Sequence, residues 1–366
     1  MAGFPFQSPD RATTAIPHLL GREPIRVDLD SARAALEGKS VLVTGAAGSI
    51  GSELCRQLLP LQPKKLVCLD RDETALFYLR LELGSENSLF YPADYTHQGA
   101  TERLLSAHGV DVIFHAAAFK HLPLMEDNPR EAIRNNVLGL YDFIQVAEQS
   151  ACKTFLFLSS DKAVNPSSVM GATKRAGELI LSSRRSSMKC LSIRSGNVLG
   201  SQGSVLPVFV KQLAEHNRLT ITHPDATRRF ITVSEAASLI LQAIAVGKDR
   251  DILVFDVAPP TRITDLARAI IQTAGKSESD VEIAFTGLRP GEKIHEELLS
   301  EGERRSPTSA KHIIRVEQVN VSRGELESGI AQLSDALPVA ADCELREMLK
   351  ELVPEYRSEA KLFAQA

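Results

Sequence analysis

The sequence predicts an α/β protein built around a doubly wound parallel sheet. From residue 39 to about residue 194, short runs of apolar residues alternate along the chain with longer stretches of helical character. Apolar runs without alternating polar residues are typical of strands buried on both faces. Regular alternation of such strands with helices indicates parallel pairing, with helices covering both faces of the sheet.

The individual elements follow from the local pattern. Buried strands are expected at residues 41–43, 66–70, 88–91, 110–115, 154–158 and 189–194. One helix is expected to follow the first strand and end at residue 61, and further helices are expected at 73–83, 97–108, 130–149 and 171–181. Beyond residue 194, glycine, proline and arginine interrupt the pattern. The elements expected there are helices at 206–216, 234–246, 263–274 and 344–353 and a strand at 252–257.

Composition and charge exclude several classes of protein. The chain has 366 residues, is 43% hydrophobic and 24% charged, and carries a net charge of −4, so neither nucleic acid nor an anionic membrane is an expected partner. The sequence contains no uninterrupted apolar run of about 18 residues, so no membrane span is expected. The five cysteines are scattered without a C-x-x-C pair. We therefore expect no disulfide framework, no metal site and a location in the reducing cytoplasm.

A glycine-rich loop follows the first strand and precedes a helix. Its small residues let a backbone approach a pyrophosphate, and the helix N-terminus offers free N–H groups and a positive dipole. Asp70 ends the next strand, where a carboxylate can bind an adenosine ribose and repel a 2′-phosphate, which favours NAD over NADP. Arg71 beside it weakens that preference. The loop residues expected to bind the cofactor are Gly45, Gly48, Ser49, Ile50 and Gly51.

The segment after the fourth strand is suited to the same crevice. Ala116 and Ala117 have small side chains, which leave room for the cofactor to lie against the backbone. Lys120 and His121 follow them and are candidate contacts to a substrate. Packing in the protein interior or exposure to solvent would explain His121 equally well.

The connection of residues 159–174 carries more functional groups than a plain connector needs. It begins where the strand at 154–158 ends, and ligands of open α/β sheets bind beyond the carboxyl ends of the strands. We therefore expect chemistry here. The candidate catalytic side chains are Ser160, Asp161, Lys162, Met170 and Lys174.

These motifs resemble those of a known superfamily. A strand ending in Ser or Thr, followed by a helix with Tyr-x-x-x-Lys, is the pattern of the short-chain dehydrogenase/reductases; Met170 stands at the Tyr position and Lys174 at the Lys position. The runs S-D-K-A-V-N-P (160–166) and G-A-T-K-R (171–175) are similar to the CapD-like UDP-N-acetylglucosamine 4,6-dehydratases of polysaccharide biosynthesis, in the subgroup with this Met. A thioether cannot exchange a proton, so the tyrosine mechanism is ruled out.

The resemblance implies a role for each side chain of the connection. Such an enzyme oxidises carbon 4 of the sugar with NAD, removes the carbon 5 proton, expels the carbon 6 hydroxyl as water and returns hydride to carbon 6. Lys162 is then the base at carbon 5, if burial or positive charge lowers its pKa. Asp161 is the acid for the departing hydroxyl, Ser160 holds the carbon 4 oxygen, and Lys174 binds the nicotinamide ribose. The acceptor of the carbon 4 hydroxyl proton stays open.

The resemblance also implies contacts to the adenine and to the nucleotide-sugar. Asp94 stands where relatives contact adenine. The runs R-S-G-N-V-L-G (194–200), T-R-R-F (227–230) and R-P-G-E (289–292) are similar to substrate motifs of the family. Arginine suits a diphosphate because its planar fork binds two oxygens at once. The implied substrate contacts are Asn197, Arg228, Arg289 and Glu292.

The expected function is NAD-dependent 4,6-dehydration of UDP-N-acetylglucosamine to a UDP-4-keto-6-deoxy-N-acetylhexosamine with retained carbon 5 configuration, for bacterial glycan biosynthesis. A carbon 5-inverting dehydratase and a UDP-hexosamine 4-epimerase are the nearest alternatives, although an epimerase does not need Asp161 and Lys162. Met170 also leaves open a non-catalytic NAD-binding scaffold.

The expected domain organisation follows from the same comparison. We expect an N-terminal arm (1–37), an NAD-binding Rossmann domain with later crossover segments (38–195), a smaller lobe that mainly binds substrate (196–330) and a C-terminal helical segment (331–366). Many relatives carry membrane spans upstream, so this chain is either a soluble relative or a trimmed form. We expect it to form a homo-oligomer.

Overall fold

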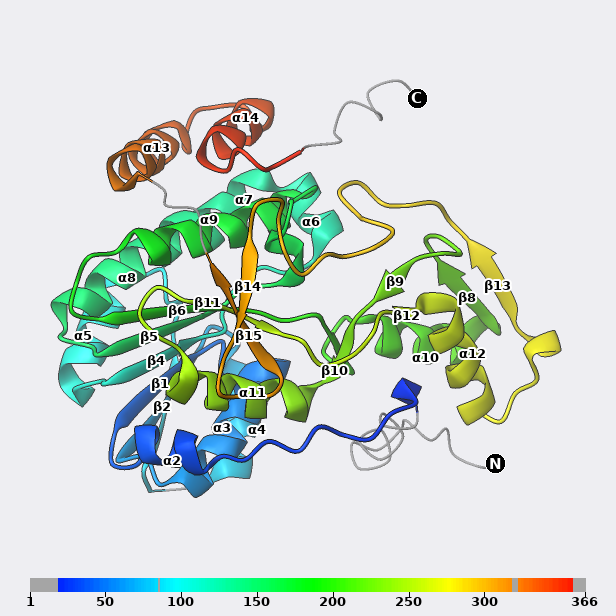
Figure 1. The fold of residues 1–366 in the computed structure, drawn as a ribbon, viewed down its shortest axis with the longest axis horizontal. Helices are drawn as coiled ribbons and strands as arrows, with labels where there is room; N and C mark the ends of the chain where they lie inside the picture. The colour runs from blue at the N-terminus through cyan, green and yellow to red at the C-terminus, as the bar shows by residue number, and fades with distance from the viewer. Residues whose placement is uncertain (1–18, 85, 318–321, 358–366) are drawn as a thin grey trace.

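The computed structural model describes residues 19–84, 86–317 and 322–357. Within this part of the chain the main sheet has nine strands in the order β14-β15-β11-β6-β5-β4-β1-β2-β3, and it forms the centre of the larger lobe (Figure 1). Its strands are β1 (Ser40–Thr44), β2 (Lys65–Asp70), β3 (Ser88–Pro92), β4 (Val112–His115), β5 (Thr154–Leu158), β6 (Lys189–Arg194), β11 (Ile252–Phe255), β14 (Arg304–Pro307) and β15 (Ile313–Glu317).

The predicted doubly wound parallel sheet is confirmed. The seven strands from β3 to β11 pair in parallel. The sequence did not reveal the edge, where β15 pairs antiparallel with β11 and β14 pairs antiparallel with β15. Because the parallel strands all run the same way, their carboxyl ends meet at one side of the sheet, and the glycine-rich loop and the connection after β5 lie there together.

Helices cover both faces of the sheet, and each face has its own apolar core. One face is covered by α2 (Asp30–Leu36), α3 (Ser49–Leu58), α4 (Glu73–Leu83) and α11 (Val233–Val246); the other by α5 (Gln98–His108), α7 (Pro129–Ile133), α8 (Leu140–Gln149) and α9 (Val169–Ser183). Short 3-10 helices lie at Leu59–Leu61, Asp161–Ala163 and Glu278–Asp280. Helix α2 lies within the segment expected to be an arm, and it buries Ala32 and Leu36 in the core.

The helix expected at 130–149 is interrupted. A π-helical segment at Arg134–Gly139 separates α7 from α8. Asn136 lies in this segment, and its amide accepts a hydrogen bond from Phe119 N and donates to Phe119 O and Thr173 Oγ1. The wider turn thus lets one side chain connect the loop after β4 to helix α9, a use typical of π-bulges near functional sites.

The smaller lobe packs around its own apolar cluster. It contains α10 (Val205–His216), α12 (Ile263–Thr273) and the parallel pair β8 (Arg218–Ile221) with β13 (Glu282–Phe285). Two short pairs lie where the chain crosses between the lobes: β7 (Asn197–Leu199) with β10 (Phe230–Thr232), and β9 (Thr227–Arg228) with β12 (Thr261–Arg262). In the part of the chain that the structure describes, no helix is both long and apolar enough for a membrane crossing.

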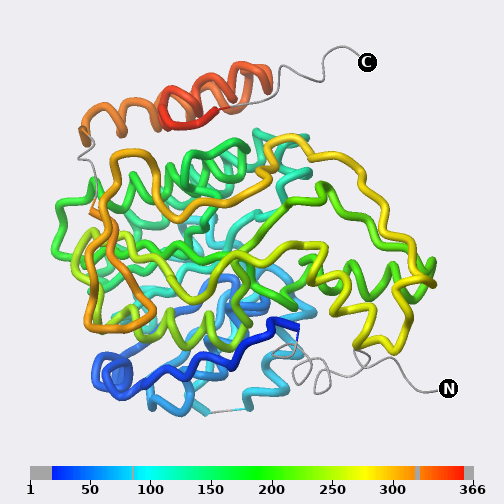
Figure 2. The backbone as a smooth tube through the Cα atoms, turned by 45° about the vertical axis from the view of Figure 1, so that its right-hand side comes forward, coloured from blue at the N-terminus to red at the C-terminus, as the bar shows by residue number. Residues whose placement is uncertain are grey.

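A C-terminal helical hairpin packs outside α9 and α7, as Figures 1 and 2 show. It consists of α13 (Arg323–Ala336), which the sequence analysis did not predict, and α14 (Asp342–Leu352). Arg346 of α14 donates to Glu126 Oε2 at 2.7 Å, at the end of α6 (Leu122–Asp127). Glu126 Oε1 in turn accepts from Val169 N at 2.6 Å, the first residue of α9. The hairpin therefore reaches the N-terminus of the helix that carries Met170.

Replacement of Arg346 by alanine is expected to destabilise the protein. Arg346 and Glu126 are 18% and 10% exposed, so removing the guanidinium leaves a largely buried carboxylate with one partner fewer. The expected loss is about 1–3 kcal/mol in the free energy of unfolding, measured by urea denaturation. Lys350→Ala on the same helix is the control, because Lys350 is 52% exposed and its Nζ lies as far as 3.9 Å from Glu347 Oε2, which makes this a weak ion pair. Equal effects of the two changes would contradict the proposed anchoring.

Candidate active site

A cavity of about 970 Å³ lies at the carboxyl ends of the strands, between the two lobes. A volume of this size is sufficient for a cofactor portion and a substrate together. Most of the side chains predicted from the sequence line it. These are Gly45, Gly48, Ser49, Ile50, Gly51, Asp70, Arg71, Asp94, Ala116, Ala117, Lys120, His121, Ser160, Lys162, Met170, Lys174, Asn197, Arg228, Arg289 and Glu292.

The glycine-rich loop has the close packing that a dinucleotide requires. Gly45 has a φ of +66°, and a Cβ there would lie 2.7 Å from Ala117 N. A Cβ on Gly51 would overlap the carbonyl oxygen of Gly45. Helix α3 begins at Ser49 without a side-chain cap, so its first N–H groups face the cavity free to bind an anion. The residues present therefore fit a pyrophosphate at this loop.

The acidic side chains predicted to contact the adenosine are held by local hydrogen bonds. Asp70 Oδ2 accepts from Ala47 N at 2.9 Å, so it also shapes the glycine-rich loop. Asp94 Oδ1 accepts from the backbone N and the hydroxyl of Thr96. A carboxylate oxygen has two lone pairs, so both side chains retain capacity for a ligand. The Arg71 guanidinium stacks 4.5 Å from the centre of the Phe119 ring, on the wall of the same cavity.

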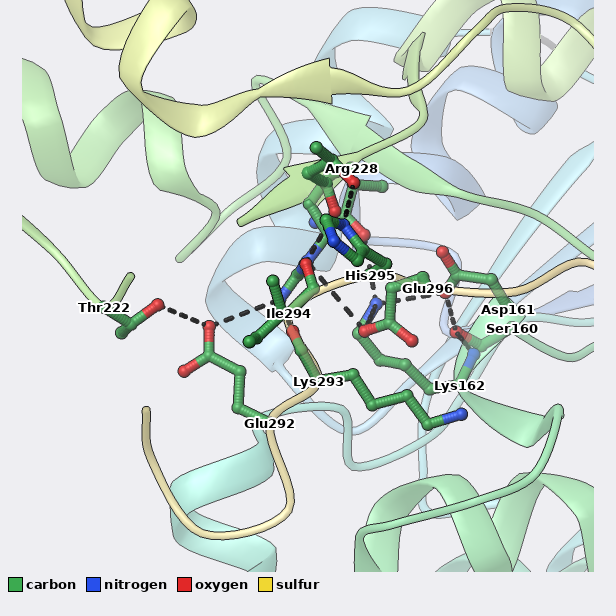
Figure 3. Close-up of polar contacts among 12 residues, drawn as sticks. Ser160, Asp161, Lys162, Thr222, Arg228, Glu292, Lys293, Ile294, His295 and Glu296 are labelled. Carbon is green, nitrogen blue, oxygen red and sulfur yellow. Dashed lines mark hydrogen bonds and ion pairs between the residues drawn. The ribbon is translucent and has the colours of Figure 1, made fainter. Parts of the chain in front are cut away.

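The connection after β5 brings three catalytic candidates into one hydrogen-bonded group (Figure 3). Ser160 Oγ donates to Asp161 Oδ1 at 3.0 Å and accepts from Lys162 N. Lys162 Nζ donates to Asp161 Oδ1 and to Asn197 Oδ1, each at 3.0 Å. Asp161 is the one member of this group that does not line the cavity: its side chain is 3% exposed and contacts Ser160 and Lys162, which do.

Lys162 does not have the lowered pKa that its expected role as a base requires. Burial by itself lowers its pKa, but attraction to Asp161 and Glu296 outweighs burial, and Arg228 opposes this only in part. The pKa of Lys162 is therefore raised, not lowered, and the resting side chain is an ammonium. A protonated amine cannot act as a base until its own proton has moved elsewhere.

Lys174 has the opposite environment. Its Nζ donates to Leu158 O at 2.8 Å and lies 4.7 Å from the centre of the Phe157 ring. Burial lowers the pKa of Lys174 to about 7, against a smaller opposing effect of Glu178. This side chain therefore changes charge near neutral pH, on the wall of the cavity that the glycine-rich loop also lines.

The stability of the cofactor-free protein is expected to rise with pH above about 7 because of Lys174. Between pH 7 and 10.5 the unfolded chain keeps a proton that the folded protein has released, so the free energy of unfolding increases with pH. Urea unfolding of the wild type and of Lys174→Met at about pH 6 and pH 9 measures the effect. The wild type should gain stability relative to the variant, and an unchanged difference would contradict the shifted pKa.

Met170 lines the cavity from the first turn of α9 and is only 3% exposed. Its backbone oxygen accepts a hydrogen bond from Thr173 Oγ1. Met170 stands at the sequence position of the tyrosine in the Tyr-x-x-x-Lys motif of short-chain dehydrogenases. A thioether carries no exchangeable proton, so proton transfer has to use other groups.

The predicted substrate residues are positioned in different ways. Lys120 Nζ donates to Gln202 O at 2.7 Å, and the His121 ring packs against Gly203 so closely that a Cβ there would lie 2.5 Å from it. Burial lowers the pKa of both Lys120 and His121. These contacts close the loop after β7 over the start of α3, where Gln202 N also donates to Ser49 Oγ.

Arg228 is largely occupied by the protein itself. It is 6% exposed and donates to the carbonyl oxygens of Thr227, Ile294 and Lys293 and, at 3.3 Å, to Glu292 Oε1. In this structure it holds the segment after R-P-G-E in place instead of presenting a free fork to a diphosphate. Arg289 is 60% exposed at the cavity, with its Nε 3.4 Å from Glu292.

Sequence reasoning missed Glu296, which lines the cavity beside Lys162. The H-E-E-L-L run gave no signal for it, because its partner lies 134 positions away in the sequence and is reached only through the fold.

The fold and the glycine-rich loop together define a dinucleotide-binding α/β protein. The chain belongs to the family of polysaccharide biosynthesis proteins, which it matches over residues 41–318. It is 44% identical over 292 residues to the probable polysaccharide biosynthesis protein EpsC of Bacillus subtilis and 43% identical over 293 residues to the capsular polysaccharide biosynthesis protein CapD of Staphylococcus aureus. Each match covers 78% of this chain and 49% of the relative, so the chain spans about half the length of these relatives.

Similar proteins with other names also occur. A UDP-glucose 4-epimerase of Rickettsia canadensis is 35% identical over 72% of this chain and 78% of its own. The solved structure of Pen from Bacillus thuringiensis has a TM-score of 0.71 at 26% identity, over 82% of this chain and 99% of that one. DesIV, a dTDP-glucose 4,6-dehydratase from Streptomyces venezuelae with NAD and TYD bound, has a TM-score of 0.66 at 22% identity, over 71% and 88%. At this sequence identity, the similarity to DesIV shows that the two proteins share a fold.

Proposed function

We propose that this protein is an NAD-dependent 4,6-dehydratase of UDP-N-acetylglucosamine, forming a UDP-4-keto-6-deoxy-N-acetylhexosamine with retained carbon 5 configuration for glycan biosynthesis. The observation that carries the proposal is the hydrogen-bonded group of Ser160, Asp161 and Lys162, of which Ser160 and Lys162 line the same cavity as the glycine-rich loop. A simple oxidoreductase or epimerase needs no acid–base pair for expelling a hydroxyl. Membership in the polysaccharide biosynthesis family supports the substrate class.

The glycine-rich loop, Asp70, Asp94 and Lys174 would hold NAD, which supplies a hydride acceptor at carbon 4 and a hydride donor at carbon 6. The Ser160 hydroxyl would hold the carbon 4 oxygen, and its hydrogen bond to Asp161 gives the proton lost there a route to that carboxylate. Asp161 then holds the proton that the departing carbon 6 hydroxyl needs, and delivers it through Ser160. Lys162 lines the cavity and would take the carbon 5 proton.

A UDP-sugar 4-epimerase is the second candidate, because the Rickettsia relatives that match 72% of this chain carry that name. The discriminating experiment is NMR of purified protein with UDP-N-acetylglucosamine. Dehydration produces a carbon 6 methyl doublet, epimerisation produces UDP-N-acetylgalactosamine without a methyl group, and a non-catalytic scaffold produces neither. Either of the last two results would overturn the proposed function.

Turnover is expected to leave absorbance at 340 nm unchanged. Hydride removed from carbon 4 returns to carbon 6 of the same sugar, so the reaction consumes no NAD. The measurement follows absorbance while NMR counts product formed without added cofactor. Accumulation of one NADH for each product would show a net oxidation and contradict the mechanism.

A further inference from the structure

Glu296 is a buried carboxylate that none of the proposed steps uses. Its side chain is 4% exposed and lines the cavity. Its Oε1 lies 3.4 Å from Lys162 Nζ and 3.9 Å from Arg228 Nε. Figure 3 shows the carboxylates of Asp161 and Glu296 both connected to the Lys162 amine. One amine is thus shared by two buried acids.

Each of these acids has an oxygen without a hydrogen-bond partner in the described part of the chain. These atoms are Asp161 Oδ2 and Glu296 Oε2, and both are buried. Nearly all buried polar atoms of native proteins are paired, and leaving one unpaired costs about 1–3 kcal/mol. Here each of the two acids that contact the Lys162 amine has one such oxygen. This arrangement suits groups that accept a proton, since a protonated carboxyl no longer carries a buried charge.

The remaining charges around Glu296 leave Lys162 as its proton donor. Arg228 does not lose its proton, and it is already bound to Glu292 and to three carbonyl oxygens. Lys293 points to Glu297 at 3.0 Å, and His295 Nδ1 is hydrogen-bonded to Thr227 Oγ1. Among the residues that the structure describes, only Lys162 combines proximity to Glu296, a proton that it can give up and a position on the cavity wall.

We infer that Glu296 accepts the proton of Lys162 and thereby converts this ammonium into the base of the reaction. The inference rests on the proposed function. The proton moves from Nζ to a carboxylate oxygen of Glu296, which leaves a neutral amine and a neutral acid. The amine takes the carbon 5 proton, gives it back to carbon 5 when carbon 6 is reduced, and then recovers its own proton from Glu296. Glu296 acts through Lys162 and is therefore a positioning residue.

Burial favours this transfer once a sugar fills the cavity. A desolvated ion pair is costly, whereas a neutral amine beside a neutral acid is much less so. Asp161 stays available for the carbon 4 and carbon 6 hydroxyl protons, because Glu296 stores the lysine proton separately. The two carboxylates therefore have different roles although they contact the same amine.

Glu296→Gln tests the inference, because the amide keeps the shape but accepts no proton. In single turnovers in deuterated water, exchange at carbon 5 is expected to fall by about 10²-fold or more, while hydride transfer from carbon 4 continues and bound NADH accumulates at 340 nm. The residual exchange should rise with pH, because Lys162 must then lose its proton to solvent. Glu297→Gln is the control: this neighbour is 51% exposed and pairs with Lys293.

A second measurement needs no substrate. In protein labelled with ¹⁵N at lysine side chains, the Lys162 amine signal, assigned with Lys162→Arg, should titrate at a lower pH in Glu296→Gln than in the wild type. The sign follows because the Glu296 charge raises the pKa of Lys162. Glu297→Gln should leave this midpoint unchanged.

Three results would overturn the inference. The first is carbon 5 exchange at the wild-type rate in Glu296→Gln, and the second is an unchanged Lys162 titration. The third is normal exchange with loss of water elimination, which would make Glu296 the acid for the departing hydroxyl. If the wild type itself neither exchanges carbon 5 nor forms a methyl group, the proposed function fails, and the titration still decides whether Glu296 controls Lys162.

Discussion

Lys162→Ala is expected to abolish dehydration while leaving the first hydride transfer intact. Lys162 Nζ is the amine that faces the cavity within the hydrogen-bonded group after β5, so its removal takes away the proposed base at carbon 5. Positioned acids and bases contribute about 10²–10⁴-fold, and product formation should fall by that amount. Bound NADH should accumulate on adding substrate, and deuterium exchange at carbon 5 should stop.

Asp161→Asn is expected to stop the reaction earlier, before the first hydride transfer. An amide can neither accept the carbon 4 hydroxyl proton through Ser160 nor protonate the departing hydroxyl, so bound NADH, carbon 5 exchange and a methyl group should all be absent. Lys153→Ala is the control for both variants, because Lys153 is 69% exposed and directly precedes β5, at its opposite end. Unimpaired exchange in Lys162→Ala would rule out this lysine as the base and direct attention to Lys120 and His121.

Gly51→Ala is expected to release the cofactor. An added Cβ would overlap the carbonyl oxygen of Gly45, which belongs to the backbone and cannot rotate away as a side chain would. Overpacking of this kind costs about 1–3 kcal/mol, which corresponds to about 5- to 150-fold in NAD affinity when the loop that binds it must shift. NAD retained through gel filtration, together with the dissociation constant from fluorescence titration, measures the loss.

Gly324→Ala is the matched control for this prediction. A Cβ at Gly324, in α13 and outside the cavity, would meet no atom within 4 Å. NAD affinity should therefore stay at the wild-type value in Gly324→Ala. Equal affinities of all three proteins would show that the loop does not contact the cofactor.

The parallel sheet could be predicted because its strands are encoded locally. The strands β2, β5 and β6 and the helix α4 begin and end within a residue of their predicted bounds. Each is an apolar run or an amphipathic stretch whose burial does not depend on which neighbour covers it. The glycine loop and the Ser160–Lys162 stretch could be found for the same reason, since their chemistry is compressed into consecutive residues.

The elements that were missed depend on partners far away in the sequence. β14 and β15 are short, polar in part and stabilised by pairing with each other and with β11. β8 and β13 pair across more than sixty positions in the smaller lobe. Helix α13 buries its apolar face against α14, α9 and the π-helical segment at Arg134–Gly139, the last two of which lie far away in the sequence. Local pattern carries little information about such pairings.

The sequence by itself determined the fold class, the glycine-rich loop and the candidate catalytic stretch. Only the tertiary structure decided how these groups are charged and used. Around Lys162 it places Asp161 and Glu296, whose charges outweigh burial and raise the pKa of that amine, and it buries Lys174, which lowers the pKa of the Lys174 amine. It also commits Arg228 to the protein backbone. The physical reason is that residue types are written in the chain, whereas desolvation and Coulomb attraction depend on distances that exist only after folding.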